Sequence, residues 1–181
     1  PNDLIGAHAS TADSAICLGE STQLHGIGEK VAAFDDFNGT SLAPFWAATL
    51  GAGIASTCGS VTGSALLFSG NGSRLARTSP MDASLGGTVH FRLMISDGSN
   101  GCDDADPGDD VILDYSVNGS SWTTIAQFNE AAFPNFTSLE VPIPVGAQTA
   151  STRFRWRQLT ANPANQDIWA LDNVIIGINA T

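Results

Sequence analysis

Apolar and polar residues alternate along most of the chain, and this period of two is typical of strands with one buried face. The segments 88–96 (TVHFRLMIS) and 152–159 (TRFRWRQL) alternate over most of their length, the second with Phe154 and Trp156 opposite three arginines. No segment keeps a helical period over several turns. The pattern therefore predicts a protein built of strands and turns.

Turn residues divide the chain into short strands. Residues 110–128 (DVILDYSVNGSSWTTIAQF) predict a hairpin whose tight turn is Asn118-Gly119. Residues 138–145 (SLEVPIPV) predict an edge strand, because prolines lack the amide hydrogen that a central strand donates. Turns at intervals of roughly eight to twelve residues favour an all-β, two-sheet antiparallel sandwich of the jelly-roll type.

The 181 residues are enough for one well-filled domain with an extra strand at its start. Residues 1–29 differ in character and predict an N-terminal strand and linker, or the end of a preceding module. Residues 30–181 predict the β-sandwich domain itself. No window is apolar for long enough to insert into a membrane.

Acidic residues outnumber basic residues by 18 to 7, which gives a net charge of −11, and Lys30 is the only lysine. This balance argues against nucleic acid as a partner, because binding phosphates requires many basic residues. It favours divalent cations as partners, or simply serves solubility.

Three cysteines, Cys17, Cys58 and Cys102, form no C-x-x-C pair and have no histidines at zinc-binding spacing. The favoured interpretation is a disulfide between two of them, which leaves one odd thiol. Five N-x-S/T sequons add only weak support for secretion, because a chain rich in Asn, Ser and Thr contains several by chance.

Two acidic motifs flank the predicted domain, FDDFNG at residues 34–39 and WALDNV at residues 169–174. The first and last strands of a sandwich are commonly neighbours, so Asp35 or Asp36 is expected to approach Asp172. Carboxylates this close together need a cation to stay ionised, and Ca²⁺ suits a set of oxygen ligands. The alternative is that Asp35 and Asp36 are solvated turn residues and that Asp172 caps a backbone turn.

A further acidic segment, residues 97–110 (DGSNGCDDADPGDD), lacks the spacing and the final glutamate of an EF-hand loop. We interpret it as an exposed, solvated loop that Cys102 anchors through a disulfide. If the partner is Cys58, closing a loop of about 45 residues stabilises the fold by about 4 kcal/mol in the chain-entropy description.

Three arginines, Arg153, Arg155 and Arg157, share one face of a predicted strand, and Arg92 and Asp114 on neighbouring strands extend the set. Such a face could bind an acidic sugar or a carboxylate-bearing partner through bidentate contacts. The competing interpretation, which we favour in so acidic a protein, is a surface ladder of Arg–Asp pairs between strands.

The sequence contains no nucleophile elbow, zinc-protease motif, P-loop or dinucleotide fingerprint, so it does not indicate an enzyme. Trp122, Trp156 and Trp169 occupy positions that predict core packing, whereas Trp46 is undecided. Few aromatic side chains then remain exposed for stacking on a neutral sugar, so an acidic glycan or a protein is the favoured ligand.

The order of motifs from residue 34 to residue 178 resembles the subrepeats of reelin. Those subrepeats share an F-E-D opening, a CG segment with a short apolar strand, a V-x-L-x-Y-S-x-N-G hairpin and a closing WALD(D/N)V-x-IG. Here the corresponding segments, in the same order, are FDDFNG, STCGSVTGSALLFSG, VILDYSVNGSSW and WALDNVIIG. The hairpin and the closing motif are the most specific parts of the match.

The resemblance implies an extracellular β-jelly roll with an architecture similar to that of carbohydrate-binding modules. It also implies a structural calcium ion between the opening acid, Asp35 or Asp36, and Asp172 of the closing motif. Groups near Ser69 and Asn71 are further possible ligands by the same resemblance.

The matching cysteines are Cys58 and Cys102, which implies that these two form the disulfide, and Cys17 lies outside the match. Two departures limit what the resemblance carries over. There is no EGF-like insert, and receptor binding in reelin relies on lysines, of which this chain has only Lys30. Scarce lysine and the segment 16–21 (ICLGES) favour one module of a multidomain surface or secreted protein of bacterial or marine origin.

We therefore expect a non-catalytic, calcium-stabilised extracellular module that serves adhesion or binds a glycan or an extracellular protein. A structural spacer that supports a neighbouring catalytic or adhesive domain is the alternative from a different class. A polysaccharide-acting jelly-roll enzyme is the third hypothesis. Glycan binding separates the first from the second, and turnover of a polysaccharide would identify the third.

Overall fold

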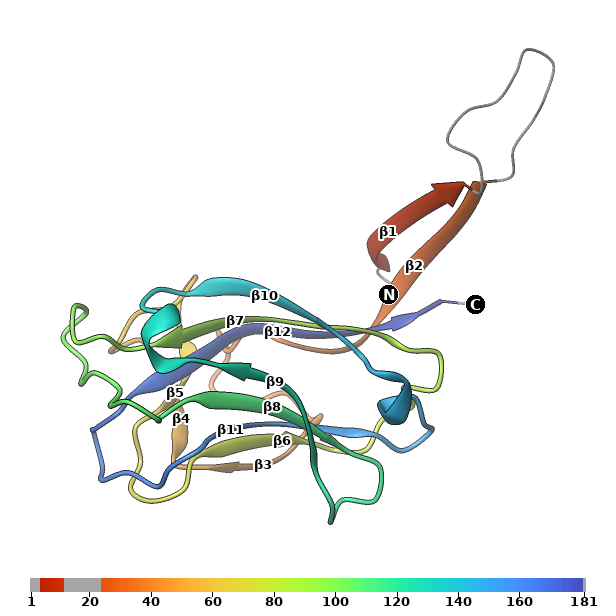
Figure 1. The fold of residues 1–181 in the computed structure, drawn as a ribbon. Coiled ribbons are helices and arrows are strands. Elements are labelled where there is room, and N and C mark those ends of the chain that lie inside the picture. The colour runs from red at the N-terminus through yellow and green to blue at the C-terminus, as the bar shows by residue number, and fades with distance from the viewer. Residues whose placement is uncertain (1–3, 12–23, 181) are drawn as a thin grey trace.

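The computed structural model describes residues 4–11 and 24–180. Two antiparallel sheets face each other across an apolar core, as the alternation predicts (Figure 1). Sheet A contains seven strands, which are β1 (Leu4–Thr11), β2 (Leu24–Asp35), β4 (Ala52–Ala55), β5 (Ala65–Phe68), β7 (Gly87–Ile95), β10 (Thr137–Pro142) and β12 (Trp169–Asn179). Sheet B contains five strands, which are β3 (Trp46–Leu50), β6 (Leu75–Thr78), β8 (Val111–Ser116), β9 (Thr123–Phe128) and β11 (Arg153–Gln158).

Strand β12 connects most of sheet A. One of its edges pairs with β7 along nearly the whole strand. Its other edge pairs with β5 through residues 169–171 and then with β2 through residues 174–179. Asp172 and Asn173 fall in the gap between these two partners, where Asn173 adopts a left-handed φ of 46°. The opening and closing segments of the domain are therefore neighbours, as expected from the two acidic motifs.

The core lies between the sheets and contains the side chains that the alternation assigns to it. On β7, Val89, Phe91 and Leu93 are at most 2% exposed. Trp156 and Trp169 are fully buried. Each large apolar side chain removed from water in this way stabilises the fold by about 1.5–3 kcal/mol.

Trp122 is an exception to the predicted core. It lies on the outer face of sheet B, where the guanidinium carbon of Arg155 is 4.1 Å from the centre of its ring. The prediction is wrong here because Trp122 precedes β9 and belongs to the hairpin loop, to which strand alternation does not apply. Trp46 is partly buried and packs against Trp156 in an edge-on contact.

The predicted hairpin and edge strand are both confirmed. Strands β8 and β9 pair, but residues 117–122 form a longer loop in place of the predicted tight turn, and of Asn118 and Gly119 only Gly119 has a positive φ, of 78°. A residue with a side chain would adopt that conformation only with strain. Strand β10 pairs with β7 alone, so the prolines of residues 138–145 lie at a sheet edge.

A second, smaller apolar cluster lies outside the main core. Its members are Cys58, Ala65, Leu67, Met94, Cys102, Ile168 and Ala170. The Cys58–Cys102 disulfide implied by the resemblance is confirmed, and it joins the loop after β4 to the acidic loop 97–110. These two loops therefore cover one part of the outer face of sheet A. Cys17 lies outside the described residues.

Strands β1 and β2 form a hairpin that extends beyond the two layers (Figure 1). Strand β2 continues through residue 30 without a break, so the hairpin and the sandwich share one strand. The division between a linker or preceding module and the domain near residue 30 stays a prediction.

In the described part of the chain the helical segments are short 3₁₀ turns, η1 (Glu130–Ala132) and η2 (Val145–Ala147). No helix there is long and apolar enough to cross a membrane.

Removing the disulfide tests how much the covering loops contribute to stability. The double variant Cys58→Ala, Cys102→Ala is expected to lose about 4 kcal/mol of unfolding free energy, because the crosslink spans 44 residues. Urea unfolding measures this loss, and reduced wild-type protein should show the same midpoint as the variant. A midpoint equal to that of the oxidised protein would contradict the expectation.

Candidate metal site and ligand-binding surfaces

The carboxylate of Asp172 is fully buried in the gap between β2 and β5. Its Oδ2 accepts the backbone N–H of Val61 at 2.7 Å, and its Oδ1 accepts the N–H of Asn173 at 2.7 Å. Burial raises the pKa of Asp172, and repulsion from Asp36 adds to the rise, while the two backbone bonds and Arg92 oppose it. Asp172 therefore holds the loop that contains Val61 and is repelled by the carboxylate of Asp36.

Two loops are fixed against each other beside these acids. Asn38 Oδ1 accepts the N–H of Ser64 at 3.0 Å, and its Nδ2 donates to Thr62 Oγ1 at 3.3 Å. Gly63 has a φ of 66°, and a side chain at this position would collide with the Asn38 amide. The sequence analysis did not identify the loop 60–64 as part of this site. The feature that indicates a loop there is its glycine among serine and threonine residues.

Asp35 has a different set of partners. Its Oδ1 accepts the N–H of Phe37 at 2.9 Å, and its Oδ2 accepts the N–H of Ala43 at 2.8 Å and Nε1–H of Trp46 at 2.9 Å. Three N–H donors thus satisfy a carboxylate that is only 8% exposed. Asp35 fixes the turn that leads from β2 toward β3.

Ser69 and Asn71 follow the end of β5 that is farther from Asp172. Leu66 pairs with Leu171 next to Asp172, and Ser69 lies three residues further along, which is roughly 10 Å at the rise of a strand. The structure does not bring these two residues to the Asp36–Asp172 pair. In the part of the chain that the structure describes, no three His, Cys, Asp or Glu side chains form a group suited to a metal ion.

Much of the acidic loop 97–110 is exposed, and it is attached to the loop before β12. Asp103 Oδ2 accepts the N–H of Asp167 at 2.9 Å, and Asp167 Oδ1 accepts the N–H of Asp106 at 3.0 Å. Burial raises the pKa of Asp167, and nearby carboxylates add to the rise. The loop is therefore held by backbone donors as well as by the disulfide.

Arg74 is a buried cation close to this loop, with only 1% of its surface exposed. It donates to the carbonyl oxygens of Gly70, Pro163 and Asp167 at 2.7–2.8 Å. Burial lowers its pKa, although the acids of the loop oppose that change. Arg74 joins the β5–β6 turn to the loop before β12 and is not available to a ligand in solvent.

The arginines singled out from the sequence divide between the two sheets. Arg153, Arg155 and Arg157 lie on β11 of sheet B, and Asp114 of β8 pairs with Arg155. Arg92 lies on β7 of sheet A, opposite Asp172. The expectation that Arg92 extends the same face is corrected, because alternation shows which side of a strand a residue occupies and not which sheet the strand joins.

Asp114 is 1% exposed and holds the arginines of sheet B together. Its Oδ2 accepts Nη2–H of Arg155 at 2.6 Å and Nε–H of Arg157 at 3.0 Å, and its Oδ1 accepts the Thr124 hydroxyl at 2.8 Å. Burial alone would raise the pKa of Asp114, but these hydrogen bonds outweigh it and keep the pKa below its ordinary value. In place of the predicted surface ladder of Arg–Asp pairs, one buried carboxylate pairs with both Arg155 and Arg157.

The uncovered part of sheet A contains a groove of about 510 Å³, which we call the sheet A groove. Its residues include a row of side chains in register on β2, β12, β7 and β10, namely Phe34, Ile175, His90 and Glu140. The ring of Phe34 belongs to a residue that is 50% exposed. His90 lies 3.0 Å from Glu29 and 3.6 Å from Glu140, through different ring nitrogens. The row thus combines an exposed aromatic ring with an imidazole held between two acids.

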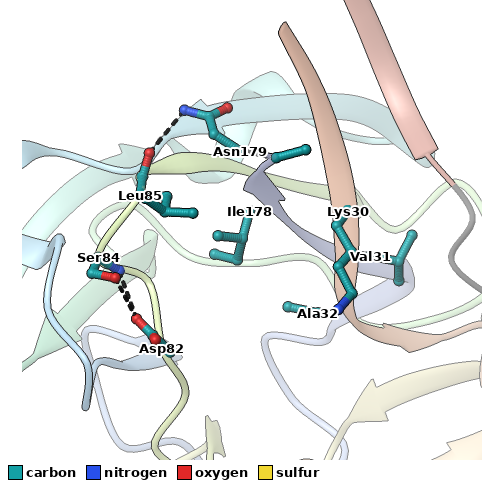
Figure 2. Close-up of a pocket in the computed structure, with 9 residues that line it drawn as sticks. Lys30, Val31, Ala32, Asp82, Ser84, Leu85, Ile178 and Asn179 are labelled. Carbon is teal, nitrogen blue, oxygen red and sulfur yellow. Dashed lines mark hydrogen bonds between the residues drawn. The ribbon is translucent and has the colours of Figure 1, made fainter.

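Another groove, of about 570 Å³, lies near the end of β12. Figure 2 shows Asp82, Ser84 and Leu85 on one side, residues 30–32 on the other, and Ile178 between them. Asp82 accepts both the N–H and the hydroxyl of Ser84 at 3.0 and 2.6 Å, so its carboxylate is already engaged within the loop. We assign no ligand to this groove.

Solved structures with a similar fold include two adhesin domains and a carbohydrate-binding module. The K1 cleaved adhesin domain of Lys-gingipain from Porphyromonas gingivalis W83 has a TM-score of 0.58 at 15% identity, covering 82% of this chain and 98% of that one. The K3 domain of the same protein has a TM-score of 0.57 at 14% identity, covering 81% and 98%. A structure from a study of promiscuous carbohydrate-binding modules of the β-sandwich superfamily has a TM-score of 0.51 at 11% identity, covering 99% and 86%. At these identities the likeness shows a shared fold.

The family comparison agrees with the motif order. The sequence model of Reelin subrepeat B matches residues 51–177, which is more than half of the chain. The matched segment runs from the start of β4 through most of β12 and contains the hairpin, both disulfide cysteines and Asp172. The chain therefore belongs to the reelin subrepeat B family.

Proposed function

We propose that this chain is a non-catalytic extracellular module that binds a glycan or an extracellular protein through the sheet A groove, within a larger secreted or surface protein. The observation that carries the proposal is the row formed by Phe34, Ile175, His90 and Glu140 on the uncovered part of the sheet. Domains of similar fold are described as adhesin domains and as a carbohydrate-binding module, which supports a binding role. The disulfide supports an oxidising, extracellular setting.

The chemistry of the row suits a sugar ring. Such a ring has an apolar face of C–H groups and a polar rim, so it needs an apolar contact beside donors and acceptors. Phe34 and Ile175 supply the apolar contact, and His90 and Glu140 supply polar groups. Because His90 is already held by acids on both sides, little side-chain entropy is lost when a ligand contacts it.

We also propose that a structural calcium ion binds between Asp36 and Asp172. The repulsion between these carboxylates and the burial of Asp172 both oppose ionisation, and a divalent cation would remove that penalty. Carbonyl and hydroxyl oxygens of the loops 36–38 and 60–64 would complete the oxygen ligands that Ca²⁺ prefers. Asp35 is not needed as a ligand, since three N–H donors already satisfy it.

Calcium should stabilise the protein if this site is real. At a calcium concentration about 100 times the dissociation constant, the unfolding free energy should rise by about 2.7 kcal/mol. In a domain of this size that corresponds to a melting temperature roughly 5–10 °C higher than in chelator. Thermal melts measure the shift, Asp172→Ala should abolish it, and magnesium serves as the control ion. An unchanged melting temperature at saturating calcium would rule the ion out.

The pH dependence of stability provides a second check. In chelator the pKa of Asp172 is raised, so between its unfolded and folded values the native state binds more protons than the unfolded state. Stability from this group therefore increases as pH falls through the folded pKa and is lost as pH rises. The melting temperature of wild type minus that of Asp172→Asn should grow from pH 7 toward pH 4 in chelator, and calcium should reverse the trend. A flat difference in chelator would contradict the assignment.

Glycan-array binding tests the sheet A groove. Phe34→Ala should weaken binding of any captured glycan by about tenfold, which corresponds to about 1.4 kcal/mol, because the apolar contact is lost. Val145→Ala, which alters a residue 82% exposed and outside the groove, is the matched control. Equal binding by both variants would place the ligand elsewhere, and the absence of any glycan or protein ligand would favour the structural spacer.

A further inference from the structure

The outer face of sheet B carries most of the positive charge of the chain. Of the seven basic residues, four belong to this face, namely Arg77 of β6 and Arg153, Arg155 and Arg157 of β11. They alternate with buried neighbours, so they share the outward side of adjacent strands. Arg77 lies directly opposite Arg155 in the register. Like charges placed opposite each other destabilise a sheet, and an anion between them removes the repulsion.

Among the described residues, Asp114 is the one acid that forms salt bridges with these arginines. Asp114 binds Arg155 through two nitrogens but binds Arg157 through Nε alone. The terminal nitrogens of Arg157 therefore have no acceptor among the described residues. Nε of Arg77 is buried and also lacks a hydrogen-bond partner there. A buried donor without an acceptor is unfavourable, so this face has more hydrogen-bond donors than acceptors.

A groove of about 330 Å³ lies beside these arginines, and we call it the arginine groove. Its volume is at the small end of the range for ligand pockets, about 300–1,000 Å³. Its lining combines guanidinium, hydroxyl and aliphatic groups, from Arg155, Arg157, Ser73, Thr160, Leu75 and Leu159. The plane of Arg155 is supported by the ring of Trp122 at 4.1 Å, which orients its donors in advance.

We propose that the arginine groove binds a uronic acid residue of an acidic glycan. The carboxylate accepts the free terminal N–H groups of Arg157, the hydroxyls of Ser73 and Thr160 serve the ring oxygens, and Leu159 contacts the C–H face. Arg–carboxylate pairs are charge-assisted and bidentate, which matches one isolated carboxylate per sugar. A dense polyanion fits less well, because the protein carries a net charge of −11. Charges of the polyanion that come within the screening length, about 8 Å at physiological salt, of the protein's acidic residues would be repelled.

This site lies on the other sheet from the sheet A groove, so either proposal can fail without the other. The probes are trimers of galacturonic acid, glucuronic acid and mannuronic acid, each compared with its uncharged methyl ester by titration calorimetry at 150 mM salt. At least one acid should bind ten or more times as tightly as its ester. Arg157→Gln should remove that preference by about tenfold. Because Arg157 also donates to the buried Asp114, the variant should melt at a lower temperature than wild type, so binding is compared at a temperature where both proteins are folded.

Arg153→Gln is the matched control, because it removes the same charge from the same strand but Arg153 lies outside the groove, beside Gly119. Its affinity should stay within twofold of wild type. Equal affinity for acid and ester, or no binding of any acid trimer at millimolar concentration, overturns the proposal. So does binding that survives Arg157→Gln but is lost in Phe34→Ala, which places the sugar in the sheet A groove. Tighter binding of a hexaglutamate peptide than of any acid trimer assigns the groove to a protein ligand and overturns the glycan.

Discussion

The fold depends on one strand having two partners in succession along the same edge. Where β12 passes from β5 to β2, its backbone has no neighbour on that side, and the buried carboxylate of Asp172 fills the opening. By accepting the N–H of Val61, from a residue 111 positions earlier in the chain, it attaches the loop between β4 and β5 to β12 at this gap. A buried carboxylate in an apolar strand is costly, and it is tolerated here because its oxygens meet backbone donors.

The alternation of residues was sufficient to predict the strands, their buried faces and the hairpin, because burial of one face imposes the period of two. The motif order added the jelly-roll family and the cysteine pairing. The sequence did not reveal which sheet each strand joins, so Arg92 was grouped with arginines of the other sheet. Nor did it reveal the loop 60–64, whose contacts with Asp172 and Asn38 join segments far apart in the chain. Trp122 was misassigned because loops are free of the alternation that strands obey.

The charges of this acidic protein are arranged by local pairing. Buried Asp35 and Asp114 each have three donor residues, and buried Arg74 has carbonyl oxygens. The two outer faces differ in which polar and charged groups stay exposed after these pairs have formed. The open part of sheet A presents an aromatic ring beside a fixed imidazole, whereas sheet B presents guanidinium groups that exceed the acids near them. One sandwich therefore exposes two chemically different surfaces.

The register around Lys30 also determines how the module responds to tension. Leu4 of β1 and Ile178 of β12 both pair with Lys30, so the chain enters and leaves the paired strands at the same level of β2. Force transmitted along the polypeptide then pulls these strand ends apart sideways, and the hydrogen bonds of the ladder break one after another instead of together. A load applied at these ends would meet the pairs of Asn179 and Ile178 with β2 before the pairs beside the buried carboxylate, while β7 holds the other edge of β12.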